Sequence, residues 1–277
     1  MTPQTVKLII PPNSITLMLT DVSVKGFSSK KIPATTLRFE TNRWTEMKYD
    51  RVIQGTFIDR PNRFIANIKI TGTDGSDPVV RCHVKNTGRC LELLVPGAKV
   101  VLSISDDPKR KTGYDLIAVY KGDLLINMDS QAPNAVVKES FEKIVGKCDN
   151  VVPEYRYGDS RFDFYAERNG EKVFAEVKGV TLESDGLALF PDAPTERGLK
   201  HIRELTGLAG SGYRCWVIFL IQMSGVRGFS PNYAMQPELG RACEEAVAAG
   251  VNVVAYDCTV AEDSLWLGDE VPVILHS

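Results

Sequence analysis

Two carboxylates and a lysine stand on either side of a two-residue turn signal in the C-terminal half of the chain. Asp163 precedes Asn169-Gly170, and Glu176 and Lys178 follow it. An Asn-Gly pair between strand-like runs is a strong signal for a hairpin. If these two residues form the loop, position 168 pairs with 171, and further along the ladder Asp163 faces Glu176.

Facing carboxylates on one side of a hairpin predict a divalent-metal site. Opposed residues have Cβ atoms about 4.5 to 5.5 Å apart, where like charges destabilise the sheet unless a cation offsets them. Mg²⁺ and Mn²⁺ take carboxylate and water oxygens as ligands. Lys178 shares a face with Glu176 because strand side chains alternate. We therefore expect Asp163, Glu176 and Lys178 to be catalytic in metal-assisted phosphodiester hydrolysis, with Asp163 and Glu176 holding the metal.

The same register assigns the other hairpin residues to the two faces of the hairpin. It places Arg161 opposite Lys178, so that this face gathers two acids and two bases, and we expect Arg161 to contact nucleic acid. The residues expected to point into the core instead are Phe162, Phe164, Ala175 and Val177. An ordinary solvated strand face with ion pairs is the alternative interpretation of these charges.

Charged residues before and after the hairpin extend the candidate site. Glu139 and Glu142 lie on a helix expected to precede it, and we choose Glu139 as a third metal ligand, with an ordinary exposed helix acid as the alternative. After the hairpin, Arg197 and His201 are four residues apart and share a helix face. They either bind phosphate at the mouth of the site or line a solvated helix.

A mixed sheet flanked by helices is expected to position these residues. After a linker near residue 130, the pattern predicts a helix over 134–145, capped by Asn134 and closed by Gly146. The remaining expected elements are strands 151–157, 161–167 and 172–180, a helix over 195–208, a buried strand 215–221, a helix over 237–249 and a strand 251–256.

The preceding part of the chain reads as a small β-barrel. Short strand-like runs at 52–58, 64–70, 79–84, 99–105 and 115–119 are separated by Gly, Pro, Asp and Asn. An OB-like barrel that binds oligonucleotides or saccharides is one interpretation, and a structural module is the other. The expected organisation is an extension over 1–45, a barrel over 46–130 and an α/β domain over 131–277. The extension is interpreted as a targeting segment or an extra strand at 14–24.

Composition limits the classes of function. A formal charge of −2 over 277 residues gives no global positive field, so any nucleic-acid contact must come from local patches. Six scattered cysteines suit a reducing compartment. The longest apolar run, 215–221, is far shorter than the about 20 residues of a membrane span. We expect a soluble cytoplasmic protein that binds no membrane, with an organelle as the alternative if the extension is a transit peptide.

Several short sequence motifs, taken in their order along the chain, resemble those of the sugar fermentation stimulation protein family. They are Arg60-Pro-Asn-Arg-Phe64, the run from Cys82 to Arg89, the run from Glu92 to Ala98, Ser160-Arg-Phe-Asp-Phe164, Glu176-Val-Lys178 and the run from Phe190 to His201. The resemblance implies an OB-like domain followed by a PD-(D/E)xK nuclease-like domain, DNA binding, and a role in regulating sugar (maltose) metabolism. It does not establish cleavage. The acidic pair and the lysine are kept, so we expect the metal site to survive, although Ser-Arg-Phe-Asp stands where many nucleases have Pro-Asp.

Within the barrel, the resemblance points to a nucleic-acid-facing set whose side chains suit phosphate and base contacts. Its members are Arg60, Asn62, Arg63, His83, Asn86, Thr87 and Arg89. A plain turn at 86–88 and a loop held by Asn62 are the alternative. We expect DNA rather than RNA as the partner. The three hypotheses are a metal-dependent nuclease, a DNA-binding regulator without catalysis, and a saccharide-binding barrel.

Overall fold

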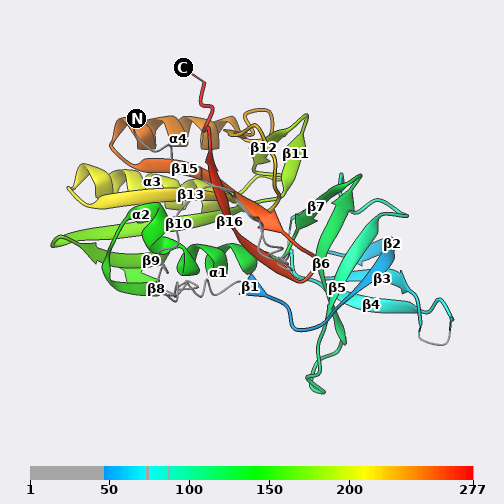
Figure 1. Ribbon diagram of the computed structural model, residues 1–277. Coiled ribbons are helices and arrows are strands. Elements are labelled where there is room, and N and C mark those ends of the chain that lie inside the picture. Colours follow the sequence, from blue (N-terminus) through cyan, green and yellow to red (C-terminus); the bar gives the residue numbers. More distant parts are fainter. Residues whose placement is uncertain (1–46, 73–74, 87, 277) are drawn as a thin grey trace, which may run out of the picture. The chain divides into compact units, whose positions relative to one another are not determined.

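The strand-like runs in the first half of the chain close into a barrel (Figure 1). Its strands are β2 (Val52–Asn62), β3 (Ile65–Ile70), β4 (Val79–Val84), β5 (Lys99–Ile104) and β6 (Tyr114–Lys121). Antiparallel pairs join β3, β2, β5 and β6, as well as β3 and β4, and the parallel pair β4–β6 closes the ring. This is the predicted OB arrangement, and the strands begin and end within a few residues of the predicted positions. β7 (Leu124–Asn127) continues the sheet beside β6.

A seven-stranded mixed sheet forms the C-terminal part, in the order β1-β16-β15-β13-β10-β9-β8. The strands are β1 (Met47–Lys48), β8 (Asp149–Tyr157), β9 (Ser160–Arg168), β10 (Glu171–Val180), β13 (Arg214–Ile221), β15 (Asn252–Val260) and β16 (Ser264–Val271). β13 runs parallel to both neighbours and is buried from its second residue on, as predicted for a central strand. β1 pairs with β16 of this sheet, although the sequence assigned residues 46–130 to the barrel.

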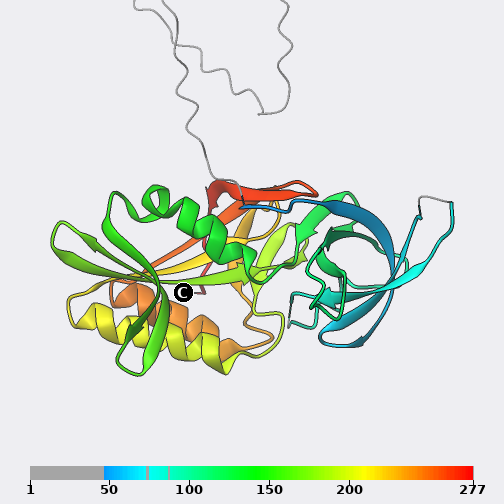
Figure 2. The same cartoon turned by 90° about the horizontal axis from the view of Figure 1, so that it is seen from below.

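Helices cover both faces of this sheet (Figures 1 and 2). α1 (Ala132–Glu139) and α2 (Phe141–Val145) lie on one face, and α3 (Glu196–Gly210) and α4 (Pro237–Ala248) lie on the other. The single helix predicted over 134–145 is therefore two helices that meet at Ser140. Pro133 lies in the first turn of α1, where proline needs no hydrogen-bond partner, so the helix starts before Asn134, which is not its cap.

Three short strands were missed by the sequence analysis. β11 (Leu182–Ser184), β12 (Leu187–Phe190) and β14 (Gly228–Pro231) form a separate sheet, with β12 in the middle. Strands of three or four residues are too short to show alternation, and no element was predicted between residues 180 and 195 or between 221 and 237. The last strand, β16, was missed as well.

The structure described is a computed structural model that places residues 47–72, 75–86 and 88–276. The predicted extension over 1–45, with its strand at 14–24, lies outside these residues. Trp44–Ser277 forms one compact unit. Within the described part, the six cysteines are free and buried, and no helix is long and apolar enough to cross a membrane.

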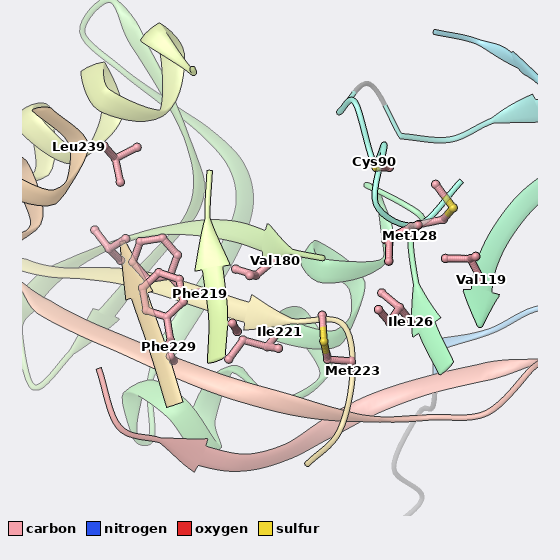
Figure 3. Packing of buried hydrophobic residues seen from close by; sticks show 14 of the residues in the cluster. Cys90, Val119, Ile126, Met128, Val180, Phe219, Ile221, Met223, Phe229 and Leu239 are labelled. Atoms are coloured by element: carbon pink, nitrogen blue, oxygen red, sulfur yellow. The ribbon is translucent and has the colours of Figure 1, made fainter. Parts of the chain in front are cut away.

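One hydrophobic core runs from the barrel into the C-terminal sheet. A single cluster of buried residues joins Ile126 and Met128 to Val180, Ile221 and Met223. Figure 3 shows these side chains packed around the junction between β7 and the ends of β10 and β13. The barrel and the C-terminal sheet therefore share apolar packing.

Buried polar groups lie at the same junction. Asp129, with no exposed surface, accepts hydrogen bonds from the Lys85 ammonium at 2.6 Å and the Tyr49 hydroxyl at 3.1 Å. The Gln222 Nε2 atom donates to Asn127 Oδ1 at 2.9 Å and to the Asp129 carbonyl at 3.0 Å. Burial, followed by the charge of Asp129, raises the pKa of Tyr49, so its hydroxyl stays a donor. These bonds satisfy groups that would otherwise be costly to bury.

The Asp129 carboxylate is predicted to dominate the stability of this junction. Asp129→Ala leaves Lys85 and Tyr49 without their buried acceptor, and breaking a buried pair in this way costs roughly 3 kcal/mol. Urea denaturation of the full chain measures the free energy of unfolding. Asp123→Ala, at an exposed position in the β6–β7 turn, should change it by less than about 0.5 kcal/mol. Equal losses in the two variants would contradict the assignment.

Candidate metal and nucleic-acid site

Glu176 is a buried carboxylate in the middle of the seven-stranded sheet. Only 2% of it is exposed, and it lies on β10 between β9 and β13. Its Oε1 atom accepts hydrogen bonds from the Lys178 ammonium at 2.6 Å and from Nδ1 of His201 on α3. In the described part of the chain its Oε2 atom is buried and has no hydrogen-bond partner. One oxygen of this carboxylate is thus available to a ligand.

Asp163 reaches β10 at the point where the β9–β10 ladder ends. The predicted register holds from Arg168↔Glu171 to Ala175↔Phe164. Beyond that pair, the Asp163 carboxylate replaces the ladder: Oδ2 accepts from the Val177 backbone N–H at 2.8 Å, and Oδ1 accepts from Asn134 Nδ2 at 2.9 Å. The side chain is therefore fixed from α1 and from β10.

The chain changes face around Asp163, which the hairpin prediction did not foresee. Phe162 packs in the layer under α3, whereas Phe164, Ala175 and Val177 pack in the layer under α1. All four are buried, as predicted, but strict alternation would place Phe162 and Phe164 on the same side. A local break in the ladder explains why pairing stops at Phe164.

The charges of the two carboxylates are coupled. Burial and then the charge of Glu176 raise the pKa of Asp163 above its ordinary value. Burial also raises the pKa of Glu176, but the His201 hydrogen bond and the Lys178 charge outweigh it, and the net pKa is lowered. Glu176 therefore carries the negative charge, and Asp163 would gain most from a nearby cation.

A divalent cation fits this pair in part. The unpartnered Oε2 of Glu176 is an oxygen ligand of the kind that Mg²⁺ and Mn²⁺ prefer, and a cation would relieve the repulsion that raises the pKa of Asp163. Both oxygens of Asp163 already accept hydrogen bonds. Each carboxylate oxygen has two lone pairs, so these bonds leave room for a metal.

The structure does not bring Glu139 to the carboxylate pair. Glu139 is exposed at the C-terminal end of α1. Among the residues that the structure describes, no group of three or more His, Cys, Asp or Glu side chains lies close enough together to hold a metal ion. Helix α1 contributes Asn134 to the site instead, because its first turn, and not its last, faces Asp163.

Arg161 also departs from its predicted place. It pairs with Arg156 across β8 and β9, and its guanidinium forms an ion pair with Glu154 at 2.9 Å. It therefore does not oppose Lys178. The break at Asp163 ends the β9–β10 ladder before it reaches Arg161.

A hollow beside the carboxylates gathers the predicted basic residues. It measures about 450 Å³, and its lining residues are Asp159, Ser160, Arg161, Glu196, Arg197, Lys200 and His201. Arg197 and Lys200 are exposed, whereas His201 is 6% exposed and bonded to Glu176. The predicted phosphate contacts at Arg161 and Arg197 are thus brought together, and His201 connects them to Glu176.

Arg60 holds the barrel loop that was predicted to face nucleic acid. Its guanidinium donates to the carbonyls of Arg63, Asn86, Gly88 and Arg89 at 2.7 to 2.9 Å. These bonds occupy both terminal nitrogens, and Nε is buried. Arg60 is half-buried and positions the loop, and its terminal nitrogens are already used by backbone carbonyls.

Two other members of the predicted nucleic-acid-facing set use their side-chain polar atoms inside the protein, and a third is not described. Asn62 accepts from the Phe64 backbone N–H at 2.9 Å, which is the loop-holding alternative considered above. Asn86 donates to the Met128 carbonyl at 3.0 Å and accepts from the Gly88 backbone N–H at 2.7 Å, so both ends of its amide are used. Thr87 lies outside the described residues.

Arg63 and Arg89 remain exposed, and Arg63 lies beside an aromatic ring that was not predicted to take part. The Arg63 guanidinium lies 5.9 Å from the Phe64 ring centroid, and Phe64 is 50% exposed. An exposed ring beside arginines can stack on a base. An apolar residue directly before a strand looks like core in a sequence, so its exposure gave no signal. Asn134 was missed as a partner of Asp163 because it was interpreted as a helix cap.

His83 belongs to an ion-pair group on the barrel. Its Nδ1 atom lies 3.3 Å from Asp115 Oδ1, and the Arg110 guanidinium donates to both oxygens of Asp115. Burial raises the pKa of Asp115, but the Arg110 hydrogen bond and charge, with smaller contributions from Lys85 and His83, lower it overall. Folding therefore stabilises the ionised form of Asp115 relative to the unfolded chain.

Comparison with known proteins agrees with this two-part arrangement. The family described as "SfsA N-terminal OB domain" matches residues 58–128, and the one described as "Sugar fermentation stimulation protein RE domain" matches residues 131–264. A sugar fermentation stimulation protein homolog from Clostridium beijerinckii is 52% identical over 231 residues, which are 83% of this chain and 100% of that protein. One from Desulfitobacterium hafniense is 50% identical over 230 residues, 83% of this chain and 99% of that protein.

A solved structure is similar over the same part of the chain. Described as "The structure of Pyrococcus Furiosus SfsA in complex with Ca2+", it has a TM-score of 0.74 and 26% sequence identity. The match covers 83% of this chain and 98% of that chain.

The Asp115 group gives a pH-dependent prediction. Because its folded-state pKa is lowered, Asp115 contributes stability above its unfolded pKa of about 4, and this contribution is lost as the pH falls through the folded pKa. Asp115→Asn should lower the free energy of unfolding by about 1 to 2 kcal/mol at pH 7, and this loss should shrink as the pH falls below about 4. Urea denaturation across this range is the measurement. Asp77→Asn, in a surface pair with Lys69, is the matched control, and a constant difference across pH would contradict the prediction.

Proposed function

The chain belongs to the sugar fermentation stimulation protein family, and from this premise we propose that it is a DNA-binding protein with a divalent-metal-dependent phosphodiesterase site. The proposal includes Mg²⁺ or Mn²⁺ as the cofactor and DNA, rather than RNA, as the partner. It makes Asp163 and Glu176 the metal ligands and Lys178 the group that acts beside them.

The observation that carries the proposal is the free oxygen of Glu176. A buried carboxylate oxygen without a partner is costly, and native structures retain such groups mainly at functional sites. Here it lies on the same strand segment as Lys178 and is electrostatically coupled to Asp163. The similar structure from Pyrococcus furiosus is a complex with Ca²⁺, which takes the same kind of oxygen ligand.

The residues of the site have separate roles in this proposal. A bound divalent cation would polarise the phosphoryl group and lower the pKa of an attacking water. Lys178 donates to Glu176 from a half-buried position, from which it orients water and balances developing negative charge. His201 holds Glu176 from α3, and Asn134 holds Asp163 from α1. Arg197 and Lys200 supply exposed positive charge for the phosphates.

The barrel supplies a second contact area in the proposal. Arg63, Phe64 and Arg89 are exposed at neighbouring positions because Arg60 bonds to the loops that carry them. Arginine contacts phosphates, and an exposed ring stacks on bases. With a net charge of −2, binding depends on such local groups and should weaken steeply with salt.

A second candidate is a DNA-binding regulator of sugar metabolism that does not cleave. Its support is that Asp163 and Glu176 are held without a metal, by Asn134, Val177, Lys178 and His201. In this case the acidic pair serves the fold. The names of the relatives, which refer to sugar fermentation stimulation, are compatible with it.

Metal binding and cleavage in matched variants separate the two candidates. With Mn²⁺, the wild type is expected to cut labelled DNA, and Glu176→Gln should reduce the rate by about 100-fold or more because a charged ligand is lost. Glu171→Gln makes the same change at the exposed start of β10 and should keep full activity. Isothermal titration of Mn²⁺ should show binding that Asp163→Ala removes.

Two results would count against the proposal in different ways. Mn²⁺ binding and tight DNA binding, with single-stranded, duplex and structured DNA and RNA all left uncut, would favour the regulator. An unchanged Mn²⁺ affinity in Asp163→Ala and Glu176→Gln would show that these two residues do not hold the metal. Circular dichroism of each variant checks that the fold is retained.

A further inference from the structure

A second cavity lies at the junction of the barrel and the C-terminal sheet. It measures about 310 Å³, within the size range of small-molecule sites. The barrel side contributes Asn86 and Gly88, and the other side contributes Gln222 and the segment from Leu189 to Thr195. Gly179, the residue after Lys178 on β10, also lines it, and Thr195 at the start of α3 joins it to the helix that carries His201.

Asp192 and Gln222 give this cavity two acceptor oxygens that have no hydrogen-bond donor within the described part of the chain. The Asp192 Oδ2 atom is buried and has no hydrogen-bond partner in the described part of the chain. Gln222 uses Nε2 to bond Asn127 and the Asp129 carbonyl, which leaves its Oε1 as the available end. The amide of Asn86 is already used at both ends. A ligand must therefore bring donors.

Two glycines make room for these acceptor oxygens. A Cβ atom on Gly88 would lie 2.5 Å from Asp192 Oδ2, and one on Gly179 would lie 2.6 Å from Gln222 Oε1. At these distances the Asp192 or Gln222 side chain would have to shift. Glycine at these positions lets the barrel loop and β10 approach the two oxygens closely.

Five further lining residues are apolar and form walls that suit a flat ring. Leu182, Leu189, Phe190, Pro191 and Pro194 contribute to the walls. Proteins that read an extruded nucleobase hold it between aromatic or apolar side chains and bond its Watson–Crick edge. The cavity combines such walls with a carboxylate.

We propose that this cavity binds a guanine base next to the cleaved phosphate, with Asp192 accepting from its Watson–Crick edge. Guanine presents two adjacent donors there, N1–H and the N2 amino group, which match a carboxylate. Adenine and cytosine each present one amino group beside a ring nitrogen acceptor, and that acceptor would be repelled. The inference rests on the proposed nucleic-acid function and adds a base preference to it.

Base preference is measured by fluorescence anisotropy with labelled oligothymidylates that carry guanine, hypoxanthine, adenine or cytosine at one central position, as DNA and as RNA. The buffer contains EDTA, so cleavage does not enter. Guanine should bind about 5- to 100-fold more tightly than the other three, since one good bidentate contact gives this discrimination. Hypoxanthine lacks only the N2 amino group and isolates its contribution.

Three variants test the residues. Asp192→Asn should abolish the guanine preference, and Gly88→Ala should do so as well because its Cβ displaces the carboxylate. Asp185→Asn removes the same charge at an exposed turn residue and should retain the preference. Thermal denaturation confirms that each variant folds.

The outcomes distinguish this inference from the proposed function. Equal affinity for the four bases, or a guanine preference that survives Asp192→Asn, overturns the guanine pocket while leaving nucleic-acid binding intact. No binding of any oligonucleotide overturns both. Guanine preference without Mn²⁺-dependent cleavage supports the pocket and removes only the catalytic claim. Ca²⁺ binding that is lost in Asp192→Asn but kept in Glu176→Gln would assign the cavity to a cation instead.

Discussion

A buried charge must be balanced, and the balance around Glu176 organises the C-terminal part of this protein. The carboxylate lies in the interior of a seven-stranded sheet, where an unpaired charge would be very costly. Lys178 on the same strand supplies the opposite charge, and His201 on α3 supplies a hydrogen bond. This requirement links the central sheet to α3, and the cap that Thr195 makes with the Gly198 backbone N–H sets where that helix begins.

The charge balance around Glu176 is incomplete, and this leaves the site able to bind a cation or a proton. Oε2 of Glu176 has no partner in the described part of the chain, and the pKa of neighbouring Asp163 is raised by burial and by the charge of Glu176. Cations and protons both relieve such a pair. A fold that only needed stability would be served better by an apolar pair at these positions.

The sequence predicted the features that depend on local pattern. The Asn169-Gly170 turn set the hairpin register, and the fully apolar run of β13 identified the central strand. It could not predict features set by tertiary contacts. Asp163 replaces a ladder bond and shifts Phe162 to the other face, which separates Arg161 from Lys178. The four backbone bonds of Arg60 and the exposure of Phe64 likewise follow from how two loops meet.

The central claim is that Asp163 and Glu176 together hold a divalent cation. The most direct test is anomalous diffraction from crystals of the wild-type protein soaked in Mn²⁺, with Glu176→Gln crystals treated in the same way. We expect an anomalous peak within about 2.5 Å of oxygens of both carboxylates in the wild type and none there in the variant. A wild-type crystal without a peak between these carboxylates, or with Mn²⁺ bound only at other residues, would contradict the account.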